Sequence, residues 1–244
     1  MTNQTNLSRR SLLATTVGIT TAVALPALAQ QPAANQRSPR GPVPTFENSQ
    51  FYTAGKFDEE KARDAIIDLC RFHRYPVFSG MREKLWVSDY GIGRFTEVGL
   101  AAIGFANKID GPSSYMLQEL FLLPNQMLPE HWHVKPADPK KGPQKDEGWL
   151  VRWGRSYVVG EGEPNLPKEV VVPKSHNNGE VTVKHCVVAD PGVFVPLSSV
   201  GSRHWQFAGE QGVILTEVAN AHDNASVRHT DKTANDTFLK GLDY

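Results

Sequence analysis

The sequence contains little cysteine, with only Cys70 and Cys186 among its 244 residues. Two distant thiols, neither of them in a CxxC pair, exclude a disulfide-rich scaffold and a cysteine-based zinc site. An oxidising compartment would permit a bridge between them, but cysteine is also a common buried apolar residue. We assign the two thiols no function and leave their pairing open.

The chain also lacks an excess of charge of one sign, with 26 basic and 26 acidic side chains. It contains no basic run with interleaved aromatic residues. Nucleic acids and anionic membrane surfaces select proteins with concentrated positive charge, so we expect neither as a partner. A polar or neutral small molecule is the expected ligand.

A long uninterrupted hydrophobic run is missing as well. The most apolar stretch, 12–28, is diluted by threonine and glycine and is shorter than the roughly 20 residues that span a bilayer. It follows Arg9-Arg10 and ends at Ala27-Leu28-Ala29, which is the pattern of a twin-arginine (Tat) signal peptide. We interpret residues 1–29 as a signal removed on export to the periplasm or medium, so that no membrane attachment remains. An uncleaved anchor is the alternative.

The rest of the chain divides by composition. Residues 30–45 are rich in Gln, Pro, Ala and Ser, which predicts a disordered linker. Residues 46–86 contain one helical pattern, 58–73, in which Asp58 can cap the first turn and apolar residues recur at helical spacing. We expect one globular domain over 87–220 and a polar C-terminal arm with short 3₁₀ pieces over 221–244.

Beyond Trp86 the pattern changes to short β segments separated by Gly, Pro and Asn. The expected strands are Glu97–Asn107, Tyr115–Leu123, Met127–His133, Glu147–Val159, Val181–Val188, Val193–Pro196, His204–Ala208 and Val213–Val218. One helix followed by about eight strands predicts an all-β domain, a sandwich or barrel of the jelly-roll kind.

The most informative segment is Pro129-Glu130-His131-Trp132-His133. Residues two apart on a strand project to the same face, so His131 and His133 can share one cation. Taken alone, the pattern is better explained by two surface histidines. Glu147 begins a later expected strand, and His204 begins another, which brings the count of candidate ligands to four.

His-x-His, Glu-x6-Gly and Gly-x2-His in this order resemble the two-part motif of the cupin superfamily. The resemblance implies a double-stranded β-helix with a metal ion inside the barrel, held by His131, His133, Glu147 and His204. The chain departs from the pattern at Asn125 and Ala208, where Gly and Asn are usual. Thirteen residues, 134–146, also separate His133 from Glu147 where three or four are typical. This insertion is rich in Lys and Pro and predicts a loop beside the barrel mouth.

Three neutral imidazoles and one carboxylate leave a divalent ion with about one net positive charge. A six-coordinate ion would keep two adjacent positions open, which suits Mn²⁺ or Fe²⁺ gripping two neighbouring substrate oxygens. Zn²⁺ is an alternative that prefers fewer ligands. Such a charge polarises a carbonyl and a hydroxyl, which favours enediol or hydride-shift chemistry.

Several further blocks resemble the D-lyxose ketol-isomerase family of small cupins. They are Asp89-Tyr90-Gly91-Ile92-Gly93, Val98-Gly99-Leu100, Glu119-Leu120-x-Leu122, Gly162-Glu163-x3-Pro167, His204-Trp205-x2-Ala208-Gly209 and Thr216-Glu217. The resemblance implies interconversion of an aldose and a ketose, such as D-lyxose and D-xylulose, with a divalent metal that is usually manganese. Gln118 stands where the family typically has a lysine that helps proton transfer. An amide can hold a sugar hydroxyl but cannot transfer a proton near neutral pH.

Two residues are candidates to replace that lysine. Glu217 shares a face with Val213 and Leu215, where burial would raise its pKa toward that of a general base. A structural partner of a ligand histidine or of Arg152 is the alternative role. His185 alternates with valines and is expected to face the barrel, as a catalytic group or as a core histidine.

Arg152 is a candidate to hold sugar oxygens, or only to pair with a carboxylate. Four tryptophans lie beside the ligand segments, and Trp149 and Trp153 share the expected face of Glu147. Tryptophan stacks on sugar C–H surfaces but more often fills a core, and both roles remain open for these two.

The leading hypothesis is therefore an exported, metal-dependent ketol isomerase of a small sugar. Other metal-cupin enzymes, such as an iron-dependent dioxygenase or a sugar-acid isomerase or lyase, fit the same ligand set. A non-catalytic, metal-dependent sugar-binding cupin is a third alternative, favoured by Gln118. We expect a homodimer, because small cupins often pair through sheet edges.

Overall fold

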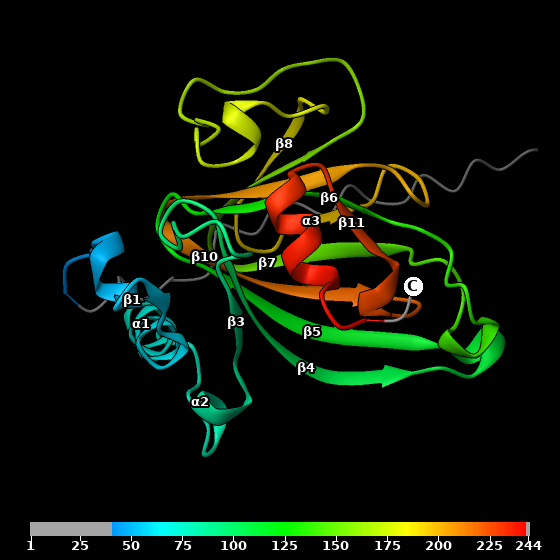
Figure 1. The fold of residues 1–244 in the computed structure, drawn as a ribbon, viewed down its shortest axis with the longest axis horizontal. Helices are drawn as coiled ribbons and strands as arrows, with labels where there is room; N and C mark the ends of the chain where they lie inside the picture. The colour runs from blue at the N-terminus through cyan, green and yellow to red at the C-terminus, as the bar shows by residue number, and fades with distance from the viewer. Residues whose placement is uncertain (1–40, 243–244) are drawn as a thin grey trace, which may run out of the picture. The chain divides into compact units, whose positions relative to one another are not determined.

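The structure is a computed structural model that describes residues 41–242 (Figure 1). The predicted signal peptide and most of the predicted linker lie outside the described residues. Within 41–242, no helix is both long enough and apolar enough to cross a membrane.

The N-terminal part of the described chain is mainly helical. Its elements are η1 (Asn48–Phe51), β1 (Tyr52–Thr53), β2 (Lys56–Phe57), α1 (Glu59–His73) and α2 (Met81–Lys84). As predicted, Asp58 caps α1, since its carboxylate accepts a hydrogen bond from the Lys61 amide. Arg74, with φ of 57°, ends the helix in the left-handed conformation. The buried face of α1 packs on the sheet through Ile66 and Leu69.

The remainder is mostly β-structure. The first elements are β3 (Trp86–Ser88), β4 (Leu100–Lys108), η2 (Gly111–Ser113), β5 (Tyr115–Leu122), β6 (Met127–His133), η3 (Pro139–Lys141) and β7 (Glu147–Gly160). They are followed by η4 (Asn177–Gly179), β8 (His185–Ala189), β9 (Phe194–Pro196), β10 (His204–Ala219), η5 (Asn224–Ser226), β11 (Val227–His229) and α3 (Lys232–Leu239).

Strands β3 to β11 form one curled, antiparallel sheet in the order β11-β6-β10-β5-β4-β3, with β7 joining β10 to β8 and β9 (Figure 1). The long strand β10 organises it, because its first residues pair with β6 and its last residues pair with β5. The sequence predicted two separate strands here. The structure instead has one strand that bends between Ala208 and Val213, where its register with β7 shifts.

A second irregularity lies in β7. Ile214 and Leu215 are adjacent on β10, but they pair with Trp153 and Val151, so Arg152 is an extra residue in β7. One extra residue reverses the alternation of side chains beyond it. Val151 therefore packs inside the barrel, whereas Trp153 packs in the cluster beneath α1.

The C-terminal tail contains a 3₁₀ segment, η5, as predicted, together with a strand and a helix that the sequence did not predict. β11 pairs antiparallel with β6, and α3 is capped by Asp231, whose carboxylate accepts from the Ala234 amide. The tail is thus part of the sheet and its covering. Cys70 and Cys186 are both buried as free thiols, in separate apolar clusters.

Candidate active site

Four buried side chains converge at one end of the barrel, as the sequence predicted. His131 and His133 project from β6, Glu147 from the start of β7, and His204 from the start of β10, where it pairs with His131. Their potential ligand atoms all lie within 4.8 Å of one another. The pairing of β6 with β10 is what closes the distance between histidines some seventy residues apart.

Backbone carbonyls orient two of these imidazoles. His131 Nδ1 lies 2.9 Å from the Pro129 carbonyl oxygen, and His204 Nδ1 lies 3.1 Å from that of Ser202. A carbonyl oxygen only accepts, so each Nδ1 carries the hydrogen and each Nε2 keeps a free lone pair. These outer contacts present both histidines as metal ligands.

The inner atoms are left without hydrogen-bond partners. Glu147 Oε1 lies 2.9 Å from His133 Nε2 and 3.2 Å from His204 Nε2, yet none of the three atoms has a hydrogen-bond partner among residues 41–242. Lone pairs that face each other in a buried site repel unless a cation lies between them. The donor set therefore fits a divalent ion, and its three histidines and one carboxylate suit several first-row metals.

The charge states agree with this fit. Burial lowers the pKa of His133 to about 4, so its imidazole is neutral at pH 7. Burial alone would raise the pKa of Glu147, but the Lys145 ammonium and the neighbouring imidazoles hold it well below its usual range. The cluster thus offers deprotonated ligands, as metal binding requires.

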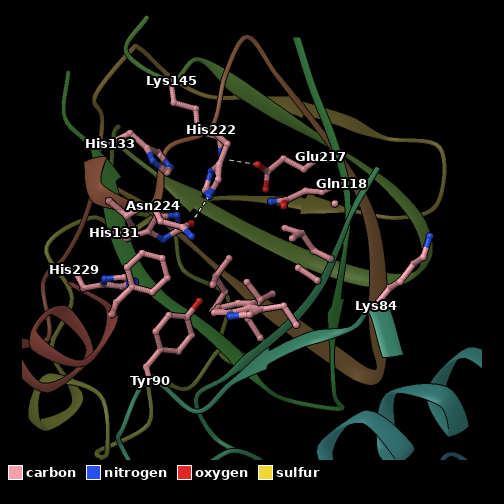
Figure 2. Close-up of a pocket in the computed structure, with 18 residues that line it drawn as sticks. Lys84, Tyr90, Gln118, His131, His133, Lys145, Glu217, His222, Asn224 and His229 are labelled. Atoms are coloured by element: carbon pink, nitrogen blue, oxygen red, sulfur yellow. Dashed lines mark hydrogen bonds and ion pairs between the residues drawn. The ribbon is translucent and has the colours of Figure 1, made fainter. Parts of the chain in front are cut away.

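A pocket of about 260 Å³ opens beside the cluster and is lined by 18 residues (Figure 2). One part of its wall is apolar and includes Trp86, Tyr90 and Phe238. The other part is polar and includes Gln118 and Glu217. A wall with one apolar and one polar side matches a small sugar, which presents both C–H surfaces and hydroxyls.

Glu217 is the acidic residue of this wall, and two buried donors hold it. Lys145 Nζ lies 2.6 Å from Glu217 Oε1, and Trp149 Nε1 donates to Glu217 Oε2 at 3.2 Å. Lys145 Nζ also lies 2.7 Å from Glu147 Oε2, so one ammonium links the metal cluster to the pocket carboxylate. Burial raises the pKa of Glu217, and Lys145 opposes that effect.

Comparison with known proteins supports a relationship to sugar isomerases. The D-lyxose ketol-isomerase of Cohnella laeviribosi is 31% identical over 161 residues, which cover 66% of this chain and 83% of that protein. The chain belongs to the D-lyxose ketol-isomerase family. A D-lyxose/D-mannose isomerase of Thermosediminibacter oceani is 32% identical over 150 residues, 62% of this chain and 78% of its own length. No family model matches the chain.

Solved structures confirm the cupin fold. L-ribose isomerase of Acinetobacter sp. DL28, in complex with L-ribose, superposes with a TM-score of 0.56 at 14% identity, covering 74% of this chain and 94% of that one. L-ribose isomerase of Cellulomonas parahominis, with L-psicose, gives a TM-score of 0.53 at 15% identity, covering 74% and 95%. The likeness at this identity concerns the fold.

The structure brings together some of the site residues predicted for this family member. Gln118 and Trp149 both pair with Glu217 across the sheet, from β5 and β7 respectively. Gln118 lines the pocket, whereas Trp149 is buried behind it and packs on His204 with ring centroids 5.1 Å apart. Trp149 therefore positions Glu217 and His204 from behind rather than forming the pocket surface.

Three other predicted residues lie outside the pocket. Arg152 is the extra residue of the bulge in β7 and Trp153 follows it, and Arg152 is exposed with its guanidinium over the Trp153 ring. His185 opens β8, where its Nδ1 lies 2.9 Å from the Glu163 carbonyl oxygen. The face predicted for Trp153 was wrong, because alternation fails at the bulge. His185, predicted to face the barrel, lies at the start of β8 and is not part of the pocket lining.

The tail supplies pocket residues that the sequence did not predict. Those in the lining are His222, Asn224, Val227, His229 and Phe238. Burial lowers the pKa of His222 to about 3, with the Lys145 charge acting in the same direction. Two histidines in a short polar tail were the available indication of a functional role. Lys145 was also missed, although its spacing of two from Glu147 places both on one side of the chain.

Proposed function

We propose that the chain is a metal-dependent aldose–ketose isomerase of a small sugar, with D-lyxose and D-xylulose as the first pair to test. The observation that carries this proposal is that Glu217, a buried carboxylate, lines the same pocket as His131 and His133, two members of the four-ligand cluster. Membership of the D-lyxose ketol-isomerase family supports the choice of reaction.

Aldose–ketose interconversion moves a hydrogen from C2 to C1 and a proton from the C2 hydroxyl to the C1 oxygen. A divalent ion in the cluster would withdraw electron density from those two oxygens. Glu217 takes the proton from C2, which gives an enediol, and then returns this proton to C1. Lys145 and Trp149 hold the two oxygens of Glu217 in place during both transfers.

Gln118 binds rather than transfers protons. Its amide lies opposite Glu217 across the β5–β10 pair and lines the pocket, where it can donate to or accept from a sugar hydroxyl. The lysine that the family typically has at this position is absent. The ammonium of Lys145, which lies just before the start of β7, contacts Glu217 instead. A cationic side chain is thus retained beside the carboxylate.

The test is a sugar panel with defined metals. Purified protein stripped of metal is reloaded separately with Mn²⁺, Fe²⁺ or Zn²⁺, and product formation is followed from D-lyxose, D-mannose and other aldoses. We expect Mn²⁺ to give the highest kcat/KM, with D-xylulose formed from D-lyxose. Absence of turnover on the whole panel with every metal would rule out the proposed isomerase.

We further propose that the enzyme works outside the cytoplasm as a homodimer. Arg9-Arg10 before an apolar run supports export by the twin-arginine route. Trp86, Phe105 and Tyr115, exposed on the edge strand β3 and its neighbours β4 and β5, support pairing of two copies. Fractionation of cells with and without the Arg9→Lys/Arg10→Lys change tests export, and light scattering of the purified protein tests the dimer.

A further inference from the structure

A second, larger cavity of about 1030 Å³ adjoins the pocket. One of its walls comes from the insertion between β6 and β7, and the other comes from the tail between β10 and β11. The insertion, 134–146, is longer than a cupin needs to connect these strands, and the isomerase proposal assigns a role only to Lys145 near its end.

One pair of side chains separates the two cavities. His222 and Asn224 line both, and His222 Nε2 lies 2.6 Å from Asn224 Oδ1 (Figure 2). Because an amide oxygen only accepts, Nε2 carries the hydrogen, and Nδ1 of a neutral ring is left as an acceptor. His222 Nδ1 is buried and has no hydrogen-bond partner within the described chain. A sugar hydroxyl is a donor of the kind that this nitrogen lacks.

The outer cavity carries an excess of positive charge. Four basic residues line it: Lys135, Lys140, Lys141 and Arg228. Lys135, Lys140 and Lys141 form no salt bridge with any residue of 41–242.

The two acidic residues of the lining are occupied within their own loops. Asp138 accepts from the Lys140 backbone amide at 2.9 Å, and Asp223 accepts from Ser226 Oγ at 2.8 Å. Each carboxylate therefore fixes a turn rather than pairing with a lysine side chain. A concave surface with unpaired cations concentrates anions from solution.

We propose that the outer cavity binds a carboxylate or phosphate on the end of the sugar remote from C1 and C2. The inference rests on the proposed isomerase function and names its substrate class, an acidic or phosphorylated aldose. The sugar lies in the inner pocket, a hydroxyl donates to His222 Nδ1, and the anionic end reaches past Asn224 to Lys140 and Lys141. A neutral pentose would fill the inner pocket and leave these cations unused.

The experiment compares matched neutral and anionic sugars on the metal-loaded full chain. The pairs are D-lyxose with D-lyxose 5-phosphate, and D-mannose with D-mannuronate and D-mannose 6-phosphate. We expect kcat/KM to favour an anionic member by about tenfold at low ionic strength, with the advantage reduced in 0.5 M NaCl because salt screens exposed charges. The phosphate and uronate arms show which anion the cavity takes.

The variant Lys140→Gln/Lys141→Gln tests the location. We expect the ratio of anionic to neutral kcat/KM to fall by about tenfold, because two exposed cations are removed. Lys168→Gln/Lys174→Gln, which changes two exposed lysines outside both cavities, serves as the matched control and should keep the ratio.

The outcomes separate this inference from the isomerase proposal. Equal or faster turnover of the neutral sugars overturns the anionic class while leaving isomerase activity intact. If no sugar is converted, calorimetry with D-arabinitol 5-phosphate against D-arabinitol decides. Tighter binding of the phosphate, lost in the Lys140/Lys141 variant, supports the cavity even without catalysis, and equal affinities overturn it.

Discussion

At the scale of single residues, the four side chains of the metal cluster are the ones whose replacement should have the largest effect on metal binding. His131, His133, Glu147 and His204 are buried, and His133 Nε2, Glu147 Oε1 and His204 Nε2 have no hydrogen-bond partner among residues 41–242. Removing one of these four residues should lower the affinity for the metal ion, whereas removing a histidine elsewhere leaves all four metal ligands in place. A histidine outside the cluster, His185, provides the comparison.

His204→Ala should abolish stoichiometric metal binding, because it removes one of the four ligands. It also removes the imidazole ring that packs against the Trp149 indole. His185→Ala should retain metal, since His185 lies on β8 away from the cluster. Metal content after gel filtration, measured by plasma mass spectrometry, distinguishes the two. Equal metal in both variants would contradict the assignment of His204.

Glu217→Gln should lower kcat by at least about 100-fold, because an amide cannot carry the proton between C2 and C1. Metal content should stay near that of the unmodified chain, because Glu217 is not among the ligands. Exchange of the substrate C2 hydrogen with deuterated solvent, followed by NMR, should disappear together with turnover. Persistent exchange in the variant would place the proton carrier elsewhere.

At the scale of the elements, β7 and β10 determine how the barrel bends. Gly154 has φ of 76°, and a Cβ built there would lie 2.0 Å from the Gly212 carbonyl oxygen. Gly212 itself lies where β10 shifts register against β7. The two strands can therefore approach only where one of them has no side chain.

Gly154→Ala should lower the free energy of unfolding by about 2 kcal/mol or more, since it combines positive φ with a backbone clash. Gly104→Ala is the matched control, because Gly104 also lies in a strand and a Cβ there meets nothing within 4 Å. Chemical denaturation of both variants measures the difference. A Gly154 variant as stable as the Gly104 variant would contradict the close approach of the strands.

At the scale of the whole molecule, buried neutral histidines tie stability to pH. Burial lowers the pKa of His73 on α1, although the Gln211 carbonyl, 2.8 Å from its Nε2, opposes this. Above the unfolded pKa of about 6.5, both states are neutral and the histidine contributes no pH dependence. Below this pKa the unfolded chain takes up a proton that the folded chain excludes, so the free energy of unfolding decreases as the pH is lowered.

We expect the free energy of unfolding to decline from pH 7 to pH 5, and His73→Gln to make this decline shallower. The difference between the two proteins at pH 8 gives the packing cost of the substitution and is subtracted. Urea titrations across the range provide the measurement. An unchanged slope in the variant would show that His73 is not held neutral by burial.

Metal binding should stabilise the whole barrel, because the ligands come from three strands that only the folded chain brings together. A metal present at 100 times its Kd adds about 2.7 kcal/mol, so EDTA should lower the Tm and Mn²⁺ should restore it. His204→Ala should show neither shift. A Tm indifferent to both reagents in the unmodified chain would count against a metal site.

Spacing along the chain predicted the all-β domain and the cap of α1, and the resemblance to the cupin motif implied the four convergent ligands. These features depend on short-range rules: alternation along a strand, capping at a helix start and the order of motifs. Gln118 and Glu217, both named as site candidates from the sequence, line one pocket, because they pair directly across β5 and β10.

Tertiary structure decided what alternation could not. A single extra residue in β7 turned Trp153 away from the pocket, and nothing in the local sequence marks that bulge. Pairing of β11 with β6 brought His222 and His229 to the site from a tail that looked like a polar arm. Lys145 became a buried partner of two carboxylates only when β7 and β10 were side by side, because burial and charge pairing depend on residues distant in the chain.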